Sequence, residues 1–170
     1  MKLKFLGTGG GRYVTGQQRR RTAGIIIETE ETQIHVDPGP GALVYANKEL
    51  ENPDEVEGLI VSHAHMDHSS DAEPIIEMIT EAYDNQAALF ANETALNGYG
   101  EIEKAISKYH EGLCSNVEKM DEGSEHEFKD LKIESQEMFH GDPRTQGFTV
   151  ETDEKKIGFW TDTQYSEELL

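Results

Sequence analysis

The sequence predicts a mixed fold of the α/β or α+β class, in which strands come first, helices follow and strands return. Short apolar runs such as residues 58–61 (Gly-Leu-Ile-Val) have the length and composition of buried strands. Between residues 42 and 109, such runs alternate with stretches whose apolar residues recur at helical spacing. From residue 125 onward, the chain contains short strand-like runs separated by turns. This order indicates a mixed class but does not separate α/β from α+β.

The individual elements are predicted from apolar periodicity and from turn residues. Strands are expected at residues 2–6, 22–29, 33–36, 56–61, 87–91, 117–120, 127–128, 131–138, 148–152 and 157–161. Helices are expected at residues 42–50 and 71–82, and from Asn92 or Thr94 to Tyr109, where residues 97–100 could interrupt the helix. The strands at 22–29 and 33–36 should form a hairpin. His35 alternates with apolar neighbours in the second of these strands, so we expect a structural role for it.

A glycine-rich segment, residues 7–11, ends the first strand. It does not match the dinucleotide-binding fingerprint, because Arg12 stands where that motif requires its last glycine and no helical pattern follows. We expect these glycines to let the backbone pass close to a ligand or metal site.

The charge of the chain is strongly negative and unevenly distributed. Thirty-four acidic residues against fifteen basic ones give a net charge of −19, which disfavours non-specific nucleic-acid binding over the whole surface. Residues 1–27 nevertheless contain basic side chains and no acidic one, with three consecutive arginines at 19–21. This local positive charge could steer an anionic substrate to one place. The alternative is that residues 19–21 form a solvated loop that pairs with acidic neighbours.

Length and composition predict one domain, residues 1–170, that can bury a core. The sequence has no run of roughly 18 apolar residues that could span a membrane, and we expect no signal peptide. Cys114 is the single cysteine, which fits a reducing cytoplasm and a small core side chain rather than a nucleophile. His110 and His126 lie in charged stretches, so both are expected at the solvated surface.

The most informative segment is residues 61–70, in which four metal-ligand side chains fall within six positions: His63, His65, Asp67 and His68. It follows a predicted strand and precedes a predicted helix, so the ligands lie on a loop. In an extended turn, the first two histidines project to the same side. Crowded imidazoles and a carboxylate are unfavourable unless a cation compensates them. The pattern therefore predicts a metal site.

Four further motifs accompany this segment: Val36-Asp37-Pro38-Gly39, Phe139-His140-Gly141, Phe159-Trp160-Thr161-Asp162-Thr163 and Phe5-Leu6-Gly7-Thr8-Gly9-Gly10. In order and spacing, from residue 1 to about 165, the motifs resemble the metallo-β-lactamase superfamily. The opening motif further resembles the branch that contains ribonuclease Z and the cyclic-phosphate phosphodiesterases. The resemblance implies an αββα sandwich, in which two mixed sheets pack face to face between helical layers.

The resemblance also implies the roles of the site residues. His63, His65 and His140 would bind a first metal, Asp67 and His68 a second, and Asp162 would bridge both, while Asp37 would orient the ligands. Asp67 and His68 are also the candidate catalytic residues. Zinc is the expected metal for both divalent ions, with manganese or iron as alternatives. Arg144 and Arg21 are candidate substrate contacts, because a guanidinium matches the oxygens of a phosphate.

One motif of the family is missing, because no histidine follows Asp162. We therefore expect the fold to be incomplete at the C-terminus, without its last strand and helix. The sequence is then a fragment of a longer protein, which is the favoured interpretation, or a genuine short form, or a chain whose site a partner completes.

The resemblance implies a metal-dependent hydrolase, a phosphodiesterase that cleaves a phosphodiester or cyclic phosphate through a metal-bound hydroxide. The alternatives are a thioester or lactone hydrolase, and a metal-binding or assembly subunit without turnover. The expected partner is a small or nucleotide-like anionic substrate and not a membrane. A homo-oligomer is an open alternative. Binding of tRNA is in doubt, because no Gly/Pro-rich insertion is present that could form a protruding arm.

Overall fold

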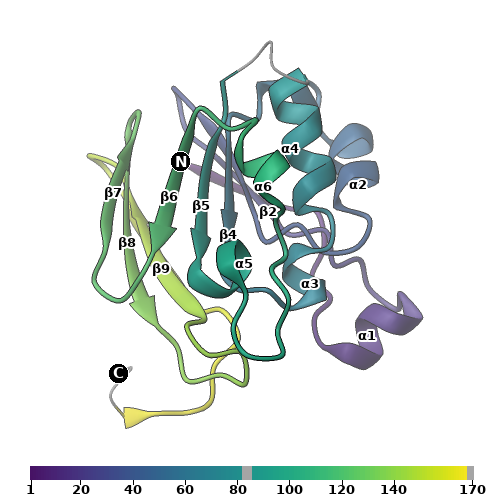
Figure 1. Cartoon of the computed structure of the whole chain (residues 1–170). Coiled ribbons are helices and arrows are strands. Elements are labelled where there is room, and N and C mark those ends of the chain that lie inside the picture. The colour runs from purple at the N-terminus through teal and green to yellow at the C-terminus, as the bar shows by residue number, and fades with distance from the viewer. Residues whose placement is uncertain (82–85, 168–170) are drawn as a thin grey trace.

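The computed structural model describes residues 1–81 and 86–167, and it has three layers. A layer of helices covers one face of a larger sheet, and a smaller sheet packs against the other face (Figure 1). The order of layers is that of the predicted sandwich. In the described part of the chain, no helix covers the outer face of the smaller sheet.

The larger sheet has the strand order β1-β2-β3-β4-β5-β6. Its strands are β1 (Lys2–Phe5), β2 (Ile25–Glu28), β3 (Gln33–Val36), β4 (Gly58–Val61), β5 (Ala88–Asn92) and β6 (Asn116–Met120). The first three strands are antiparallel, and β3 to β6 are parallel. Every residue of β4 and β5 is buried, because these central strands are covered on both faces.

The smaller sheet is antiparallel, in the order β10-β9-β8-β7. Its strands are β7 (Glu125–Phe128), β8 (Leu131–Glu137), β9 (Gln146–Glu151) and β10 (Lys156–Phe159). Along β8, Leu131 and Ile133 are buried, whereas Lys132 and Gln136 are exposed. This alternation places one apolar face against the larger sheet, where Ile133 joins a core cluster with Ile60 and Phe90.

The helical layer is short and irregular. It contains α2 (Ala42–Glu49), the 3₁₀ helix η1 (Pro53–Glu55), α4 (Ala72–Thr80), α5 (Glu93–Asn97) and α6 (Lys108–Glu111). Ile75, Ile76 and Ile79 of α4 are fully buried in the second core cluster, on the helical face of the larger sheet. Two further short helices, α1 (Arg12–Gln17) and α3 (Met66–Ser69), lie in loops. No helix among the described residues is long and apolar enough to cross a membrane.

Two predictions about helices were wrong. The segment after the glycines forms α1, and residues 66–69 of the predicted metal loop form α3. The interruption that residues 97–100 allowed is confirmed, because Gly98 adopts a φ of 74° and ends α5, but it is longer than expected, since α6 starts only after Ser107. The predicted start at Asn92 is confirmed, since its side chain accepts a hydrogen bond from the Ala95 amide. Residue 82, the predicted end of α4, lies outside the described residues.

His110 and His126 are less exposed to solvent than predicted. The His110 side chain is only 16% exposed, because it lies between the carboxylates of Glu73 and Glu77 on α4. His126 is half-buried and contacts Glu118 and the Phe90 ring. The structural role expected for His35 agrees with its burial.

Candidate metal centre

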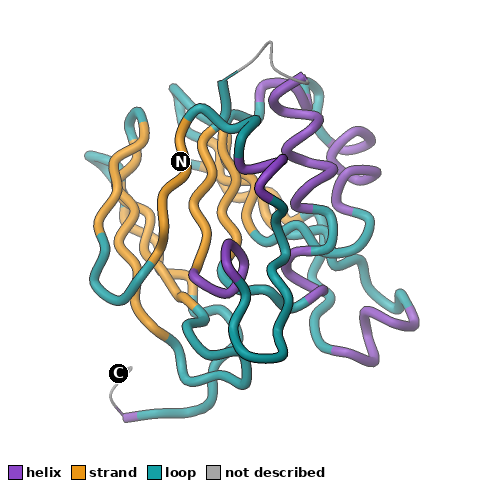
Figure 2. Tube along the Cα trace, in the orientation of Figure 1, coloured by secondary structure: helices purple, strands orange, loops and turns teal. Residues whose placement is uncertain are grey.

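The predicted ligands gather at one edge of the two sheets, where the loops collect (Figure 2). Asp37 follows β3, and His63 lies two residues after β4. Carboxyl ends of parallel strands meet at the same edge of a sheet, which brings these two residues together. His140 lies in the β8–β9 connection and Asp162 follows β10, so both come from the smaller sheet. The site therefore lies between the two sheets.

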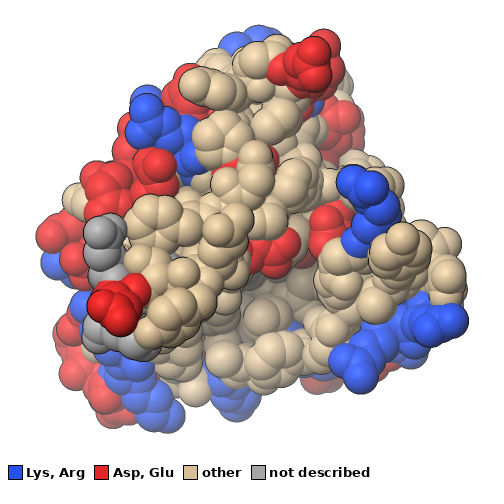
Figure 3. All heavy atoms as spheres, turned by 90° about the horizontal axis from the view of Figure 1, so that it is seen from below, with Lys and Arg blue, Asp and Glu red and all other residues tan. Residues whose placement is uncertain are grey.

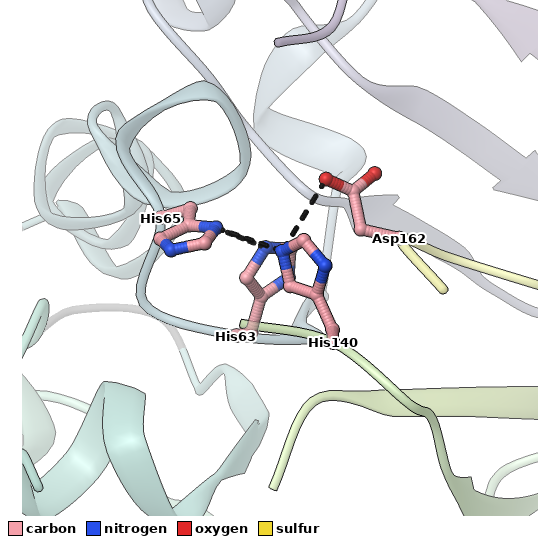
Figure 4. A group of neighbouring side chains, drawn as sticks. All are labelled: His63, His65, His140 and Asp162. Carbon is pink, nitrogen blue, oxygen red and sulfur yellow. Dashed lines mark hydrogen bonds and ion pairs between the residues drawn. The ribbon is translucent and has the colours of Figure 1, made fainter. Parts of the chain in front are cut away.

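The first group of ligands is formed by His63, His65, His140 and Asp162, and one ligand atom from each lies within 4.8 Å of the others. His65 Nδ1 is 3.2 Å from His63 Nε2 and 3.0 Å from His140 Nε2. Asp162 Oδ2 is 3.6 Å from His140 Nε2. Figure 4 shows the three rings pointing toward one another, with the Asp162 carboxylate beside them.

The second group consists of Asp67, His68 and Asp162. His68 Nε2 is 3.7 Å from Asp67 Oδ2 and 3.5 Å from Asp162 Oδ1. Asp162 is thus common to both groups and offers a different oxygen to each. The structure brings together all six side chains for which the sequence predicted a metal-binding role.

The donor set fits divalent cations. Imidazole nitrogens and carboxylate oxygens without a thiolate suit zinc, manganese or iron. Two ligands of one tetrahedral zinc ion lie about 3.3 Å apart, close to the 3.2 and 3.0 Å between the facing nitrogens. Such nitrogens cannot all donate to one another, so a shared cation accounts for their arrangement better than hydrogen bonding does.

The titration behaviour of the metal-free site supports the same conclusion. Burial, reinforced by the charge of His68, lowers the pKa of His63 to about 3. Burial would also lower the pKa of His68, but the carboxylates of Asp37 and Asp162 outweigh it and raise this pKa to about 10. The hydrogen bond with His68 in turn lowers the pKa of Asp162 to about 2 despite partial burial. The carboxylates of Asp37 and Asp162 thus favour a positive charge at this position.

Asp37 holds both parts of the metal loop. Its Oδ1 accepts the Ser62 amide at 2.8 Å, and its Oδ2 accepts the Ser62 hydroxyl at 2.8 Å and lies 2.9 Å from His68 Nδ1. The Ser62 hydroxyl in turn lies 3.0 Å from His63 Nδ1. Burial alone would raise the pKa of Asp37, but His68 and the Ser62 amide keep it below its ordinary value. Asp37 also has a φ of 48°, a left-handed conformation that non-glycine residues rarely adopt.

Asp142 is a site residue that the sequence analysis missed. It is fully buried, and its Oδ2 accepts the Ala64 amide at 2.9 Å and the Thr94 hydroxyl at 3.1 Å. It thereby fixes the backbone between His63 and His65 from the opposite sheet. Its Oδ1 is buried and has no hydrogen-bond partner among the described residues. The Gly-Asp pair directly after His140 was the available signal, but the contact spans 78 residues of sequence.

The two predicted substrate contacts are engaged in ion pairs. Arg21 contacts Glu49 at 2.8 Å and lies over the Tyr45 ring, 4.0 Å from its centroid. Arg144 contacts Glu137 at 3.1 Å. For Arg21, the structure therefore agrees with the alternative that this loop pairs with acidic neighbours. The role of both residues toward a substrate stays a prediction.

Comparisons with known proteins agree with this geometry. Residues 32–170 match the model of the beta-lactamase superfamily domain. The chain is 37% identical, over 171 residues, to the uncharacterized protein MJ1374 of Methanocaldococcus jannaschii. This alignment covers 100% of the chain but only 64% of MJ1374, so the chain spans about two thirds of its relative's length.

Two solved structures share the fold. The metallo-beta-lactamase fold protein YhfI from Bacillus subtilis superposes with a TM-score of 0.74 at 14% identity, over 98% of this chain and 64% of YhfI. The short form of human tRNase Z superposes with a TM-score of 0.67 at 16% identity, over 95% of this chain and 69% of that enzyme. These similarities confirm the predicted fold, including the arrangement of two packed sheets.

Proposed function

Since this chain belongs to the metallo-β-lactamase superfamily, whose members are generally hydrolytic metalloenzymes, we propose that it is a metal-dependent phosphodiesterase. The observation that carries the proposal is the pair of ligand groups that share Asp162. A shared carboxylate is the arrangement expected when two cations lie close enough to act on one substrate group.

In this proposal, the residues would divide between two cations in the way the sequence analysis expected. His63, His65 and His140 would hold one ion, Asp67 and His68 the other, and Asp162 would contact both. Zinc is the first candidate, with manganese and iron as alternatives. Bound divalent ions would polarise a phosphoryl oxygen and lower the pKa of a bound water toward neutral pH.

The protein's own residues would position these groups. Asp37 orients His63 through Ser62 and contacts His68 directly. The Gly11 amide donates to Asp67 Oδ2 at 2.5 Å, which fixes that carboxylate next to the glycine loop. On a substrate, Arg144 and Arg21 could exchange their glutamate partners for phosphate oxygens. The preference for a phosphodiester over a thioester or lactone is supported by Arg12, which directly follows the Gly11 amide bonded to Asp67, and by the shared fold with human tRNase Z.

The proposal is tested by turnover with defined metals. Protein freed of metal and then supplied with Zn²⁺, Mn²⁺ or Fe²⁺ should hydrolyse bis-p-nitrophenyl phosphate but not an acyl thioester. Asp162→Asn should lose the activity, whereas Lys155→Ala, on an exposed turn, should retain it. Thioester hydrolysis without phosphodiester hydrolysis would favour the alternative enzyme class. Bound metal without turnover of either substrate would favour a metal-binding or assembly subunit.

A further inference from the structure

Residues 10–20, here called the arginine loop, form a projecting segment beside the metal centre. Its base is closed by the Gly9 amide, which donates to the Arg21 carbonyl at 2.7 Å. A Cβ at Gly9 would lie 2.8 Å from the Arg20 carbonyl oxygen, so the two ends of the loop are in close contact. Within it, α1 buries Thr15 and leaves Arg12 and Tyr13 exposed. The loop is therefore anchored and presents its basic residues to solvent.

The loop is directly connected to the candidate metal centre. The hydrogen bond from Gly11 to Asp67 joins its backbone to a predicted ligand. Arg12 is the next residue, so it leaves the backbone next to this contact. Figure 3 views the molecule from below and shows a hollow with basic side chains grouped along its right side. Figure 1 places α1 on the same side of the molecule.

The three arginines of the arginine loop form no ion pairs with carboxylates of the described residues. Of the five arginines, Arg21 and Arg144 form ion pairs with glutamates. Arg12, Arg19 and Arg20 are exposed, and none of them pairs with a carboxylate of the described residues. This is unexpected in a chain of net charge −19, where carboxylates outnumber basic groups more than two to one. Unpaired guanidinium groups at the edge of a hydrolytic site suit a second anionic group of a substrate.

Exposed apolar side chains lie in the arginine loop and next to the predicted metal ligands in the sequence. Tyr13 of the loop is 80% exposed, Met66 of the metal loop 64%, and Phe139, next to His140, 46%. Exposed aromatic rings beside a basic surface are the combination that binds single-stranded nucleic acids, because bases stack on the rings while cations contact the phosphates.

We infer that the arginine loop is a second anion-binding subsite, in which Arg12, Arg19 and Arg20 hold phosphates adjacent to the one at the metal centre. The preferred substrate is then a single-stranded oligonucleotide rather than an isolated phosphodiester. This inference rests on the proposed phosphodiesterase function and specifies its substrate class.

Binding of an oligonucleotide tests the subsite without requiring turnover. The probe is a fluorescein-labelled single-stranded RNA of about twelve nucleotides, within the footprint of single-strand-binding proteins. Fluorescence anisotropy would give its Kd for the Zn²⁺-supplied protein between about 50 and 200 mM salt. The variant R12Q/R19Q/R20Q should bind about tenfold or more weakly. Its plot of log Kd against log salt should be shallower by about 2, because three phosphate contacts each contribute about 0.7 to the slope.

Two matched variants separate this effect from misfolding and from general charge. R12K/R19K/R20K keeps the charges and should keep most of the salt dependence. K104Q/K155Q removes two exposed lysines elsewhere and should bind like the wild type. Unchanged oligonucleotide binding by R12Q/R19Q/R20Q, or no binding by the wild type, would overturn the subsite. Hydrolysis of bis-p-nitrophenyl phosphate by the wild type and by K104Q/K155Q tests the proposed function separately, and we expect equal rates for these two proteins.

Discussion

At the scale of single residues, His63 is the ligand whose loss is most informative. It is fully buried, and its ring contacts those of His65, His68 and His140. His63→Ala should abolish binding at the first ligand group, an effect larger than the roughly 10–100-fold loss of affinity typical of outer-shell changes. Elemental analysis of the purified variants measures it. His126→Ala, at a histidine that belongs to neither ligand group, should retain full metal content, and full content in His63→Ala would refute the ligand assignment.

Asp142 should act as a positioning residue. Asp142→Ala leaves the Ala64 amide without its acceptor and removes one of the two acceptors of the Thr94 hydroxyl, so we expect a destabilisation of about 1–3 kcal/mol. Metal affinity should fall about 10–100-fold, because the loop between two ligands loses its support. Asp142→Asn keeps one carbonyl oxygen and should have intermediate affinity in a metal titration. Equal affinity in all three proteins would assign Asp142 to stability alone.

Cys114 should be poorly reactive. Burial, together with the charge of Glu111, raises the pKa of its thiol to about 11. At pH 8 the thiolate fraction is then about 1 in 1000, compared with about 1 in 4 for a thiol of ordinary pKa. Alkylation by iodoacetamide should be on the order of 100-fold slower in the native protein than in denaturant. Equal rates would show that the thiol is accessible and ordinary.

At the scale of elements, Gly39 determines how closely the loop after β3 approaches the metal loop. A Cβ at this position would lie 2.1 Å from the Asp67 carbonyl oxygen and 2.3 Å from that of Thr22. Gly39→Ala should therefore cost about 1–3 kcal/mol and weaken metal binding, because the backbone at Asp67 must move. Urea unfolding and elemental analysis measure the two effects. Gly16→Ala, where a Cβ meets open space within a helix, should be neutral or slightly stabilising.

The strands were predictable because their signal is local. The predicted hairpin is confirmed as β2 and β3, and the buried run at residues 58–61 is β4. Short helices were not predictable in this way. At six residues, α1 has fewer than two turns, too few to show a repeating apolar pattern, and its N-cap is Gly11, which makes no side-chain capping hydrogen bond. Tertiary contacts fix such segments.

The candidate site shows the same limit. His63, His65, Asp67 and His68 lie within six positions, so their pattern is visible in the sequence. The role of Asp142 depends on a hydrogen bond to a residue 78 positions away, and no local pattern encodes it. The ion pairs of Arg21 and Arg144 likewise depend on which glutamate the fold brings near.

At the scale of the whole molecule, the candidate metal centre connects the two sheets. His63 and His65 follow β4 of the larger sheet, whereas His140 and Asp162 belong to connections of the smaller one. Around the ligands, the Gln146 amide donates to the Ser62 carbonyl at 3.0 Å, a direct bond between the same two parts. Metal binding between the two sheets should therefore stabilise the packing of the entire sandwich, and not only the loops.

Removal of metal should accordingly lower the unfolding temperature. A ligand present at about 100 times its Kd stabilises the native state by about 2.7 kcal/mol. For a chain of 170 residues, each kcal/mol shifts Tm by about 2–4 °C, so chelation should lower Tm by about 5–10 °C. Calorimetry with and without EDTA measures the shift. Asp162→Ala, which removes the carboxylate common to both groups, should respond much less, whereas His126→Ala should respond like the wild type. If the Tm of the metal-containing wild-type protein did not change on addition of EDTA, the ions would not contribute to the packing of the two sheets.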